Sequence, residues 1–347
     1  MALLSYRQPG LVLGVGLTRA TELQVTDLQR DLRALGYLRK GIDGRFGDAT
    51  RLAVAALQHD LLANFGESRG GDGQAPLRIA GFNRGRVASP TGEVDEALTA
   101  CISELLDEPR FPKLPSSANP AAANRAALAG LRLLPSDRAP MTFILAILGQ
   151  ESGWKHFNEP VRGDQDAFLV VGLDTNAGEP FIVTSRGYGM GQYTLFHHPP
   201  RPEEVEGVML DPAKNVQRAI DELCEKLEDF LIGPTPGTRA DDRIAEIGAG
   251  PLRRCKYESR DPRFQVDCKN CLLRAGTREI RDGATPLHAD TAETYAPTQY
   301  YREASYRGVP DRSKIGCDWP YAVRRYNGSG VNSYHYQARV LLRALEL

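Results

Sequence analysis

The sequence lacks the charge asymmetry and the metal-ligand spacings that mark several large classes of protein. Its 347 residues contain 43 Lys and Arg against 44 Asp and Glu, which gives a net charge of -1. This balance gives no electrostatic reason to expect nucleic acid or an anionic membrane surface as a partner. The six histidines show no H-E-x-x-H or paired spacing, and no Walker loop or dinucleotide fingerprint is present. We therefore expect no catalytic metal and no cofactor.

Long apolar runs are also missing. The longest run near the start, Gly10 to Leu17, is far shorter than the roughly 20 residues that a membrane span requires. Residues 1–20 lack the basic start, the apolar stretch of about 7 to 15 residues and the small-residue cleavage site of a secretory signal. We expect no membrane anchor, and delivery by another route if the protein works outside the cytoplasm.

Cysteine is rare until late in the chain. Cys101 and Cys224 stand apart, whereas Cys255, Cys268, Cys271 and Cys317 fall within one late stretch. Cys268 and Cys271 form a C-x-x-C step. Three states are compatible with this pattern: a pair of disulfides, which we favour, free buried thiols, or a zinc knuckle.

A small helical module is predicted near the start. Apolar residues recur with helical spacing in two places, at Val25, Leu28, Leu32 and Leu35 and again at Val54, Leu57 and Leu61. Between them, residues 43–47 indicate a tight glycine turn, and Asp48 is a plausible N-cap of the second helix. A third helix over residues 97–106 closes the module, which we bound at residues 20–108.

Two stretches without apolar periodicity surround the third helix. Residues 64–89 are rich in Gly, Arg and Asp, which predicts an exposed insertion without a chemical role. Residues 109–120 are dense in proline and serine and are interpreted as a linker. The second domain then spans residues 121–347.

The second domain is predicted to be mostly helical. An apolar run from Met141 to Leu148 follows Pro140, which suits the first turn of a helix. Two further stripes continue the pattern, Val216, Ile220, Leu223, Leu227 and Phe230 after Asp211-Pro212, and Ala338, Leu341, Leu342 and Leu345 near the end. Residues of about 233–317 form an irregular insertion. The fold class is therefore mainly α.

Glu151 is the best candidate for acid chemistry. It follows the apolar run directly, and a carboxyl group at the end of such a helix is costly to ionise, which raises its pKa and keeps a proton available. Trp154 adds a further apolar neighbour in sequence. The structural alternative is a helix-terminal glutamate that faces water.

The histidine pair His197-His198 stands directly before Pro199. We interpret it as part of a surface loop.

Four motifs in order resemble those of lysozyme-like lytic transglycosylases and endolysins. They are residues 150–154 (QESGW), 187–192 (GYGMGQ), Asp211-Pro212 with Asn215-Val216, and 326–330 (YNGSG). The resemblance implies that Glu151 is the single catalytic acid and base. It further implies a sugar cleft lined by Ser152, Tyr188, Met190, Gln192, Tyr326 and Asn327. The chain departs from the family in the long gap between Glu151 and Gln192, in Gly191, where Met is commoner, and in the cysteine-bearing insertion.

The first domain resembles the three-helix peptidoglycan-binding module found beside many wall enzymes. The residues that carry this resemblance include Leu35-Gly36-Tyr37, Asp43 to Gly47, Thr50 and Ala53-Val54. It implies a wall-binding role for Tyr37, Asp43, Arg45 and Phe46. The split at residues 64–89 is a departure from the module.

Together the two resemblances predict an enzyme that cleaves the bond between N-acetylmuramic acid and N-acetylglucosamine in peptidoglycan by lytic transglycosylation. The alternatives are a hydrolytic muramidase, which needs a second carboxylate from Glu159, Asp164, Asp166 or Asp174, and a non-catalytic wall-binding protein. We expect the protein to act in the periplasm or cell wall, delivered by phage lysis or a specialised secretion system. An interbacterial toxin of this kind would have an immunity protein as a partner.

Overall fold

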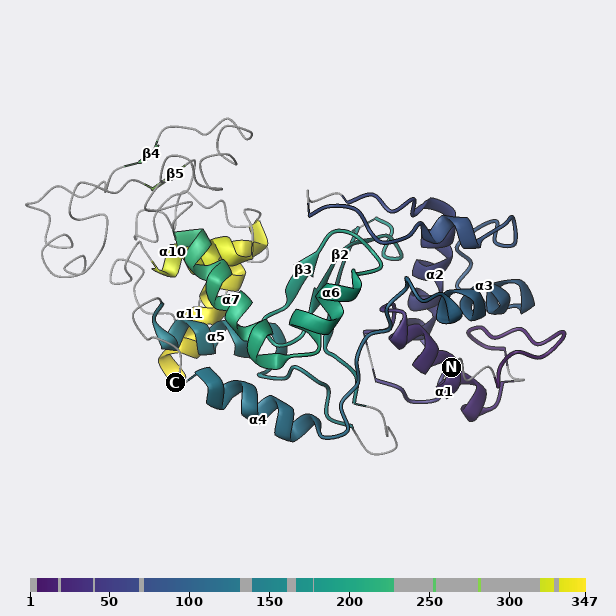
Figure 1. Ribbon diagram of the computed structural model, residues 1–347, viewed down its shortest axis with the longest axis horizontal. Coiled ribbons are helices and arrows are strands. Elements are labelled where there is room, and N and C mark those ends of the chain that lie inside the picture. The colour runs from purple at the N-terminus through teal and green to yellow at the C-terminus, as the bar shows by residue number, and fades with distance from the viewer. Residues whose placement is uncertain are drawn as a thin grey trace, which may run out of the picture. The chain divides into compact units, whose positions relative to one another are not determined.

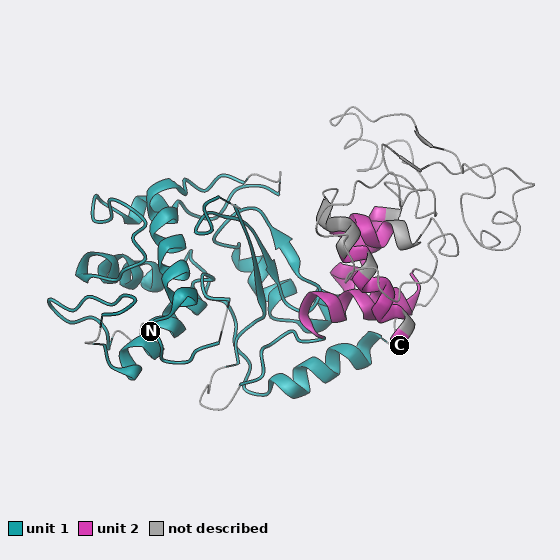
Figure 2. Cartoon of the chain, turned by 180° about the vertical axis from the view of Figure 1, so that it is seen from behind, with its two compact units in different colours: residues 1–133, 154–216 teal, residues 134–153, 217–347 magenta. Residues whose placement is uncertain are grey.

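The helices and strands of the computed structural model are labelled in Figure 1. The chain divides into two compact units, which Figure 2 colours separately. The structure describes residues 5–17, 20–39, 41–68, 72–131, 139–160, 167–176, 178–227, 252–253, 280–281, 319–327 and 331–347. Unit 1 comprises Met1–Leu133 and Trp154–Val216, and unit 2 comprises Leu134–Gly153 and Gln217–Leu347. Both units are therefore built from two separate stretches of the chain.

Unit 1 begins with the predicted helical module. Its helices are α1 (Glu22–Ala34), α2 (Asp48–Ala63) and α3 (Glu96–Asp107), which confirms the mainly α prediction for this part. A capping box of Thr21 and Gln24 starts α1, and Asp95 caps α3 by accepting from the Leu98 N–H at 2.8 Å. Asp48, however, is the first residue of α2 rather than its N-cap, which is Gly47.

A buried glutamine shapes the glycine turn between α1 and α2. The amide nitrogen of Gln29 donates to Asp43 Oδ1 at 2.9 Å and to the Arg45 carbonyl at 3.1 Å. Its oxygen accepts from the backbone N–H groups of Asp43 and Gly44 at 3.0 and 2.9 Å. Gly44 has a φ of +69°, which an L side chain rarely adopts. One side chain from α1 thus bonds three backbone groups of the turn.

The insertion at residues 64–89 is not simply exposed, as the sequence predicted. Leu77, Ile79 and Val87 are buried in the same apolar core as α1, α2 and α3, and Ile79 starts the short 3₁₀ helix η1 (Ile79–Phe82). The prediction was wrong because three isolated apolar residues in a polar segment leave no periodic pattern, although each fills a place in the core.

The segment predicted as a linker packs against the module. Phe111 and Leu114 are buried, and the Leu114 N–H donates to the Ala34 carbonyl at 2.9 Å. The Lys113 ammonium donates to the carbonyls of Leu105, Glu108 and Phe111 at 3.2, 2.9 and 2.7 Å, and these bonds satisfy carbonyls at the end of α3 and just beyond it. The compact units accordingly divide elsewhere than at residues 109–120.

Unit 1 also contains a three-stranded antiparallel sheet that the sequence did not predict. Strand β1 (Val171–Thr175) pairs with β2 (Val183–Tyr188), which pairs with β3 (Tyr193–Leu195). A second apolar cluster lies around the sheet and includes Phe157, Leu169, Tyr188 and Leu195. The remaining elements of the unit are α4 (Pro120–Leu131), α6 (Pro202–Glu204), the π-helical turn η2 (Val205–Met209) and the start of α7 (Pro212–Leu227).

The described part of unit 2 is mostly helical. Helix α5 (Met141–Ser152) packs with α10 (Trp319–Tyr326) and α11 (Val331–Glu346), and the rest of α7 belongs to the same unit (Figure 2). The predicted apolar helices at 141–148, after Asp211-Pro212 and near the chain end are therefore confirmed. Two short strands, β4 (Leu252–Arg253) and β5 (Ile280–Arg281), pair antiparallel.

Several sequence predictions fall outside the described residues. They include the insertion at about 233–317, where the structure describes only β4 and β5. The four cysteines of this insertion, Cys255, Cys268, Cys271 and Cys317, are likewise outside the described residues. Cys101 and Cys224 are buried free thiols. None of the helices in the described ranges has the length and apolar character needed to cross a membrane.

Candidate functional site

Glu151 lies in the last turn of α5, and the residues after it explain why the helix ends there. Gly153 adopts a left-handed conformation with φ +63°, and its N–H donates to the Gly149 carbonyl at 3.1 Å. A glycine at this position is the common stop signal of a helix, because its backbone adopts positive φ without strain. The apolar residues Ile144, Ile147 and Leu148 are buried. Glu151 is left half-buried at the edge of this apolar helix.

Two tyrosines from the C-terminal helices of unit 2 lie near the Glu151 carboxylate. The rings of Tyr326 and Tyr336 are stacked, with centroids 6.4 Å apart and planes inclined by 11°. Burial raises the pKa of both hydroxyls well above its usual value, and the charge of Glu151 raises each further. Both the charge of Glu151 and hydrogen bonding to it raise the pKa of Tyr336, although the hydroxyl has no partner in full hydrogen-bond geometry among the described residues. Both hydroxyls therefore stay protonated next to the carboxylate.

Two other predicted site residues have backbone roles in unit 2. The Ser152 hydroxyl donates to the Leu148 carbonyl one turn back at 3.0 Å. Asn327 is exposed, and its N–H donates to the Arg324 carbonyl at 3.2 Å at the end of α10. Four of the predicted site residues, Glu151, Ser152, Tyr326 and Asn327, belong to unit 2. Of these, the structure brings Tyr326 close to Glu151.

The predicted sugar-binding motif at residues 187–192 forms the end of β2 and the turn into β3, all in unit 1. Tyr188 and Met190 are completely buried, and the Tyr188 ring belongs to the apolar cluster around the sheet. Gln192 has a φ of +52°, and its amide nitrogen donates to the Gly189 carbonyl at 2.8 Å. Its side chain covers Gly172 and Gly187. A Cβ atom added to either glycine would lie only 2.2 or 2.7 Å from Oε1 of Gln192, so both positions need glycine for this side chain to fit. Gln192 is the member of this motif whose side chain reaches the surface in part, and Gly187 is half-buried as well.

A buried histidine and a buried asparagine hold this turn in place. The His156 Nδ1 accepts from the Met190 N–H at 3.2 Å, and its Nε2 donates to the Met209 carbonyl at 2.7 Å. Asn215 accepts from the Gly191 N–H at 2.7 Å and donates to the Tyr188 carbonyl at 2.9 Å. Burial lowers the pKa of His156 to about 4, so the ring is neutral and both nitrogens can serve these bonds.

Gly189 has no room for a side chain, and Gly189→Ala is expected to destabilise the fold by about 2–5 kcal/mol. Its φ is +74°, which costs an L residue about 1–2 kcal/mol. A Cβ would also lie 2.5 Å from the His156 ring and 2.8 Å from the Asn215 amide, and such overpacking typically costs about 1–3 kcal/mol. Denaturant unfolding measures the loss.

Gly207→Ala is the matched control, because a Cβ there meets no atom within 4 Å. It should change the unfolding free energy by less than about 0.5 kcal/mol. Equal effects of the two substitutions would contradict the assignment of a tight His156–Asn215 clamp.

The module and the sheet of unit 1 are joined by a buried ion pair. Asp60 of α2 and Arg186 of β2 are 3.2 Å apart, with side chains 10% and 5% exposed. The Tyr37 hydroxyl donates to Asp60 at 2.7 Å, and the Arg186 guanidinium lies 5.2 Å from the centre of the Tyr37 ring. Burial alone would raise the pKa of Asp60, but the nearby His59 and Arg186 lower it to about 2.

His197 and His198 are buried in unit 1, so the surface-loop interpretation was wrong. The His198 ring packs edge-on against Tyr37 and Phe111, at 5.0 and 5.5 Å between centroids. Burial lowers the pKa of His198 well below its usual value. The sequence did not reveal this burial because the neighbours of His198 come from the module and from the segment after it, more than 80 residues earlier.

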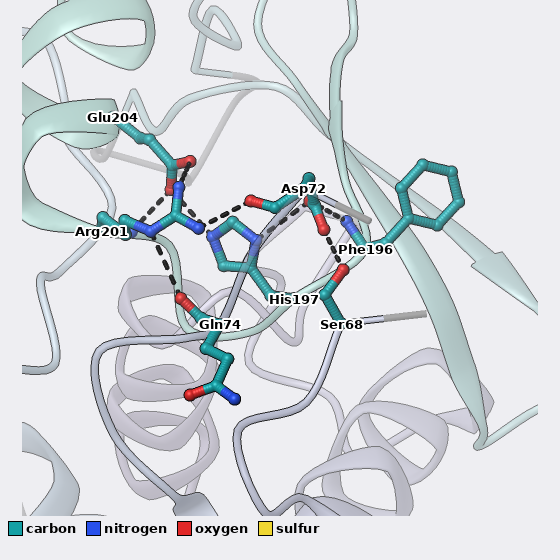
Figure 3. A network of polar contacts seen from close by, with 7 residues as sticks. All are labelled: Ser68, Asp72, Gln74, Phe196, His197, Arg201 and Glu204. Carbon is teal, nitrogen blue, oxygen red and sulfur yellow. Dashed lines mark hydrogen bonds and ion pairs between the residues drawn. The ribbon is translucent and has the colours of Figure 1, made fainter. Parts of the chain in front are cut away.

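His197 ties the insertion at residues 64–89 to the segment after β3 (Figure 3). Its Nδ1 lies 2.9 Å from Asp72 Oδ2 and its Nε2 lies 3.0 Å from Glu204 Oε2. Arg201 bonds Glu204 at 2.9 Å and reaches back to the Asp72 carbonyl at 2.6 Å. Ser68 also bonds Asp72. The insertion is therefore fixed by a charged network rather than left free.

The residues predicted for wall binding differ in their accessibility. Tyr37 is 1% exposed, and its hydroxyl is engaged by Asp60. Phe46 is half-buried against the core of the module. Asp43 and Arg45 are exposed in the glycine turn, where Asp43 Oδ1 also accepts from the Arg45 N–H at 3.0 Å. Arg45 is thus the predicted wall residue whose side chain is most open to a ligand.

Residues 21–61 match the family described as "Putative peptidoglycan binding domain". The chain therefore carries a peptidoglycan-binding module, with α1 and all but the last two residues of α2 inside the matched range, and this module associates the protein with the cell wall. The comparison with curated proteins finds no match, and neither does the comparison with solved structures. The catalytic assignment thus depends on the residues of the chain itself.

Several residues of the site could not be predicted. Asn215 belongs to a motif that the sequence presents, but His156, Tyr336 and Arg186 stand in no recognisable pattern, because their partners lie 34 or more positions away. Among the described residues, no group of three or more His, Cys, Asp and Glu side chains is arranged to hold a metal ion.

Proposed function

We propose that the protein cleaves the glycan strands of peptidoglycan, between N-acetylmuramic acid and N-acetylglucosamine, by lytic transglycosylation. The observation that carries the proposal is Glu151 at the end of an apolar helix, next to Tyr326 and Tyr336, in a chain that also has a peptidoglycan-binding module. The ordered motifs around Glu151, Gln192 and Tyr326 support it further.

In the proposed reaction Glu151 acts first as an acid and then as a base. It protonates the glycosidic oxygen, so that the bond to the muramoyl C1 breaks and the N-acetylglucosamine hydroxyl leaves. The carboxylate then removes the proton from the muramoyl C6 hydroxyl, whose oxygen bonds to C1 and closes a 1,6-anhydro ring. Water is not consumed, and Glu151 ends the cycle protonated as it began.

The neighbouring tyrosines suit this double role. Since burial keeps the hydroxyls of Tyr326 and Tyr336 protonated, each can donate to Glu151 while the latter carries a charge. We assign the glycine turn that His156 and Asn215 hold to sugar contact through its backbone and through Gln192. Rigid support of this kind holds the backbone groups of the turn in one arrangement for a sugar.

A hydrolytic muramidase is the main rival, because glycoside hydrolysis normally needs a second carboxylate. Asp164 and Asp166 lie outside the described residues. Glu159 is exposed in the loop that follows α5, and Asp174 of β1 accepts from the Ser185 hydroxyl at 2.8 Å. These four remain the candidates for the missing base if water attacks.

Mass spectrometry of digested sacculi tests the reaction type. We expect muropeptides that end in 1,6-anhydro-N-acetylmuramic acid, each about 18 mass units lighter than a hydrolysis product because no water is added. Reducing-end sugars would instead establish hydrolysis. Cleaved stem peptides with intact glycan would overturn the proposal, including the role of Glu151.

The site of action follows from the polymer. We propose that the protein works in the periplasm or cell wall, delivered by phage lysis or by a specialised secretion system. If a secretion system delivers the protein, the producing cell needs an immunity protein that covers Glu151. A neighbouring gene that encodes a small periplasmic protein would therefore favour secretion over phage lysis.

A further inference from the structure

Unit 1 contains a pocket between α2 of the peptidoglycan-binding module and the strands β1 and β2. Its volume is about 330 Å³, at the lower end of the roughly 300–1,000 Å³ typical of small-molecule sites. The module contributes six of the ten residues that line it, and the sheet and the loop between its strands contribute the rest. We call it the α2–sheet pocket.

The walls of the α2–sheet pocket are aliphatic and small. On the helix side they are formed by one face of α2, with the i, i+3, i+4, i+7 spacing of Ala49, Leu52, Ala53 and Ala56. On the sheet side, Leu173 lies beside Thr175 and Val183, which are paired across β1 and β2. Because the alanine side chains are small, they leave the pocket open where larger side chains of α2 would fill it. The pocket therefore suits a ligand with small apolar groups.

Arg39 supplies a positive charge at this pocket. Its side chain is exposed and forms no ion pair with any residue in the described part of the chain. The lining residues include no acidic side chain, so the guanidinium is available to a carboxylate from a ligand. An arginine can hold a carboxylate through two parallel hydrogen bonds, which adds geometric selectivity to the charge.

The same residues disfavour a sugar as the occupant. Sugar recognition in such a pocket needs polar groups that are available for the hydroxyls of the ring. Tyr37 also lines the pocket, but its hydroxyl is engaged by Asp60 and its ring is covered by Arg186. Leu52, Leu173 and Val183 offer no hydrogen bonds. A glycan chain could therefore replace its lost hydration only through the Arg39 guanidinium and the Thr175 hydroxyl.

We propose that the α2–sheet pocket binds the stem peptide of peptidoglycan, with an alanine methyl group against α2 and a peptide carboxylate on Arg39. The inference rests on the proposed peptidoglycan-directed function. Stem peptides combine alanine side chains with free carboxylates, which matches both features of the pocket. The protein would then hold the polymer by its peptide in unit 1, apart from the glycan chemistry assigned to Glu151.

Calorimetric titration of the full chain with three soluble probes tests this inference. The probes are a disaccharide-tetrapeptide of peptidoglycan, the free tetrapeptide, and glycan oligomers from which an amidase has removed the peptides. We expect both peptide-bearing probes to bind with similar Kd and the peptide-free glycan not to displace the tetrapeptide. Arg39→Ala should weaken tetrapeptide binding about tenfold or more, because it removes a charge-assisted contact. Ala49→Phe should weaken it as well by filling the pocket.

Arg7→Ala is the matched control, since Arg7 is an exposed arginine of unit 1 that does not line the pocket and has no assigned role in wall binding. It should leave the Kd of the tetrapeptide unchanged. Equal losses in the two arginine variants, or displacement of the tetrapeptide by peptide-free glycan, would overturn the inference. The free tetrapeptide contains no glycosidic bond, so its binding involves no turnover. A protein that binds the tetrapeptide but releases no anhydro product from sacculi would refute the proposed function alone.

Discussion

Glu151→Gln is expected to reduce the clearing of a sacculus suspension by roughly 10²- to 10⁴-fold, the usual contribution of a general acid. Glutamine keeps the shape of the side chain but can neither give nor take the proton that the proposed reaction needs. Helix α5 should persist, because its end is set by Gly153 and its buried face by Ile144 and Leu148. The initial rate at which a suspension of purified sacculi loses turbidity measures the effect.

Two comparisons separate a catalytic loss from a structural one. The variant should still pellet with sacculi as the native chain does, because the peptidoglycan-binding module lies in unit 1. Glu159→Gln, at an exposed position shortly after α5, should keep the native rate if transglycosylation is correct. A native rate in the Glu151 variant would remove this residue from the mechanism.

Arg186→Met is expected to lower the free energy of unfolding by about 3–5 kcal/mol, the cost of leaving one member of a buried ion pair alone. Asp60 would keep its bond from Tyr37 but lose the guanidinium 3.2 Å away. Replacing both partners, Asp60→Leu with Arg186→Met, should recover part of this loss. Arg51→Met breaks an exposed pair with Asp48 and should cost at most about 1 kcal/mol.

The pH dependence gives this prediction a second readout. In the native chain the pKa of Asp60 is about 2, below its usual value of 3.8, so its ionised form adds stability above pH 3.8. That contribution is lost as the pH falls through about 2. Without Arg186 the pKa of Asp60 rises, and protonation then relieves the unpaired charge. The destabilisation should therefore be larger at pH 7 than at pH 4. A deficit that does not vary with pH would contradict this account.

Local patterns predicted the helices well and the sheet not at all. Helices α1, α2 and α7 each show apolar residues at helical spacing, and α5 is a continuous apolar run after a proline, so the sequence displays directly which side chains each helix buries. Strand β2 reads Val-Thr-Ser-Arg-Gly-Tyr and alternates poorly, because Arg186 is buried against Asp60 instead of facing water. A charge that finds its partner 126 positions away cannot be recognised as a core residue from its neighbours.

The sequence predicted those site residues whose neighbours in the chain mark their chemical role. Glu151 stands directly after an apolar helix and before a glycine stop, and both features are visible in the sequence. Tyr336 could not be predicted, because α11 brings it to Glu151 from 185 positions later in the chain without any motif of its own. Tyr188 and Met190 carry the family motif, yet both are buried, which leaves the backbone and Gln192 for contact.

The order of the two units along the chain affects how the protein is made. Unit 1 is complete only when Val216 has been synthesised, because its second stretch follows the excursion through α5. At a translation rate of about 5–20 residues per second, the 126 positions between Asp60 and Arg186 take roughly 6–25 s. During this interval the nascent module carries Asp60 and Tyr37 without the strand that covers them. A chaperone that shields this face, or slow codons placed after residue 61, would therefore influence the yield of folded protein.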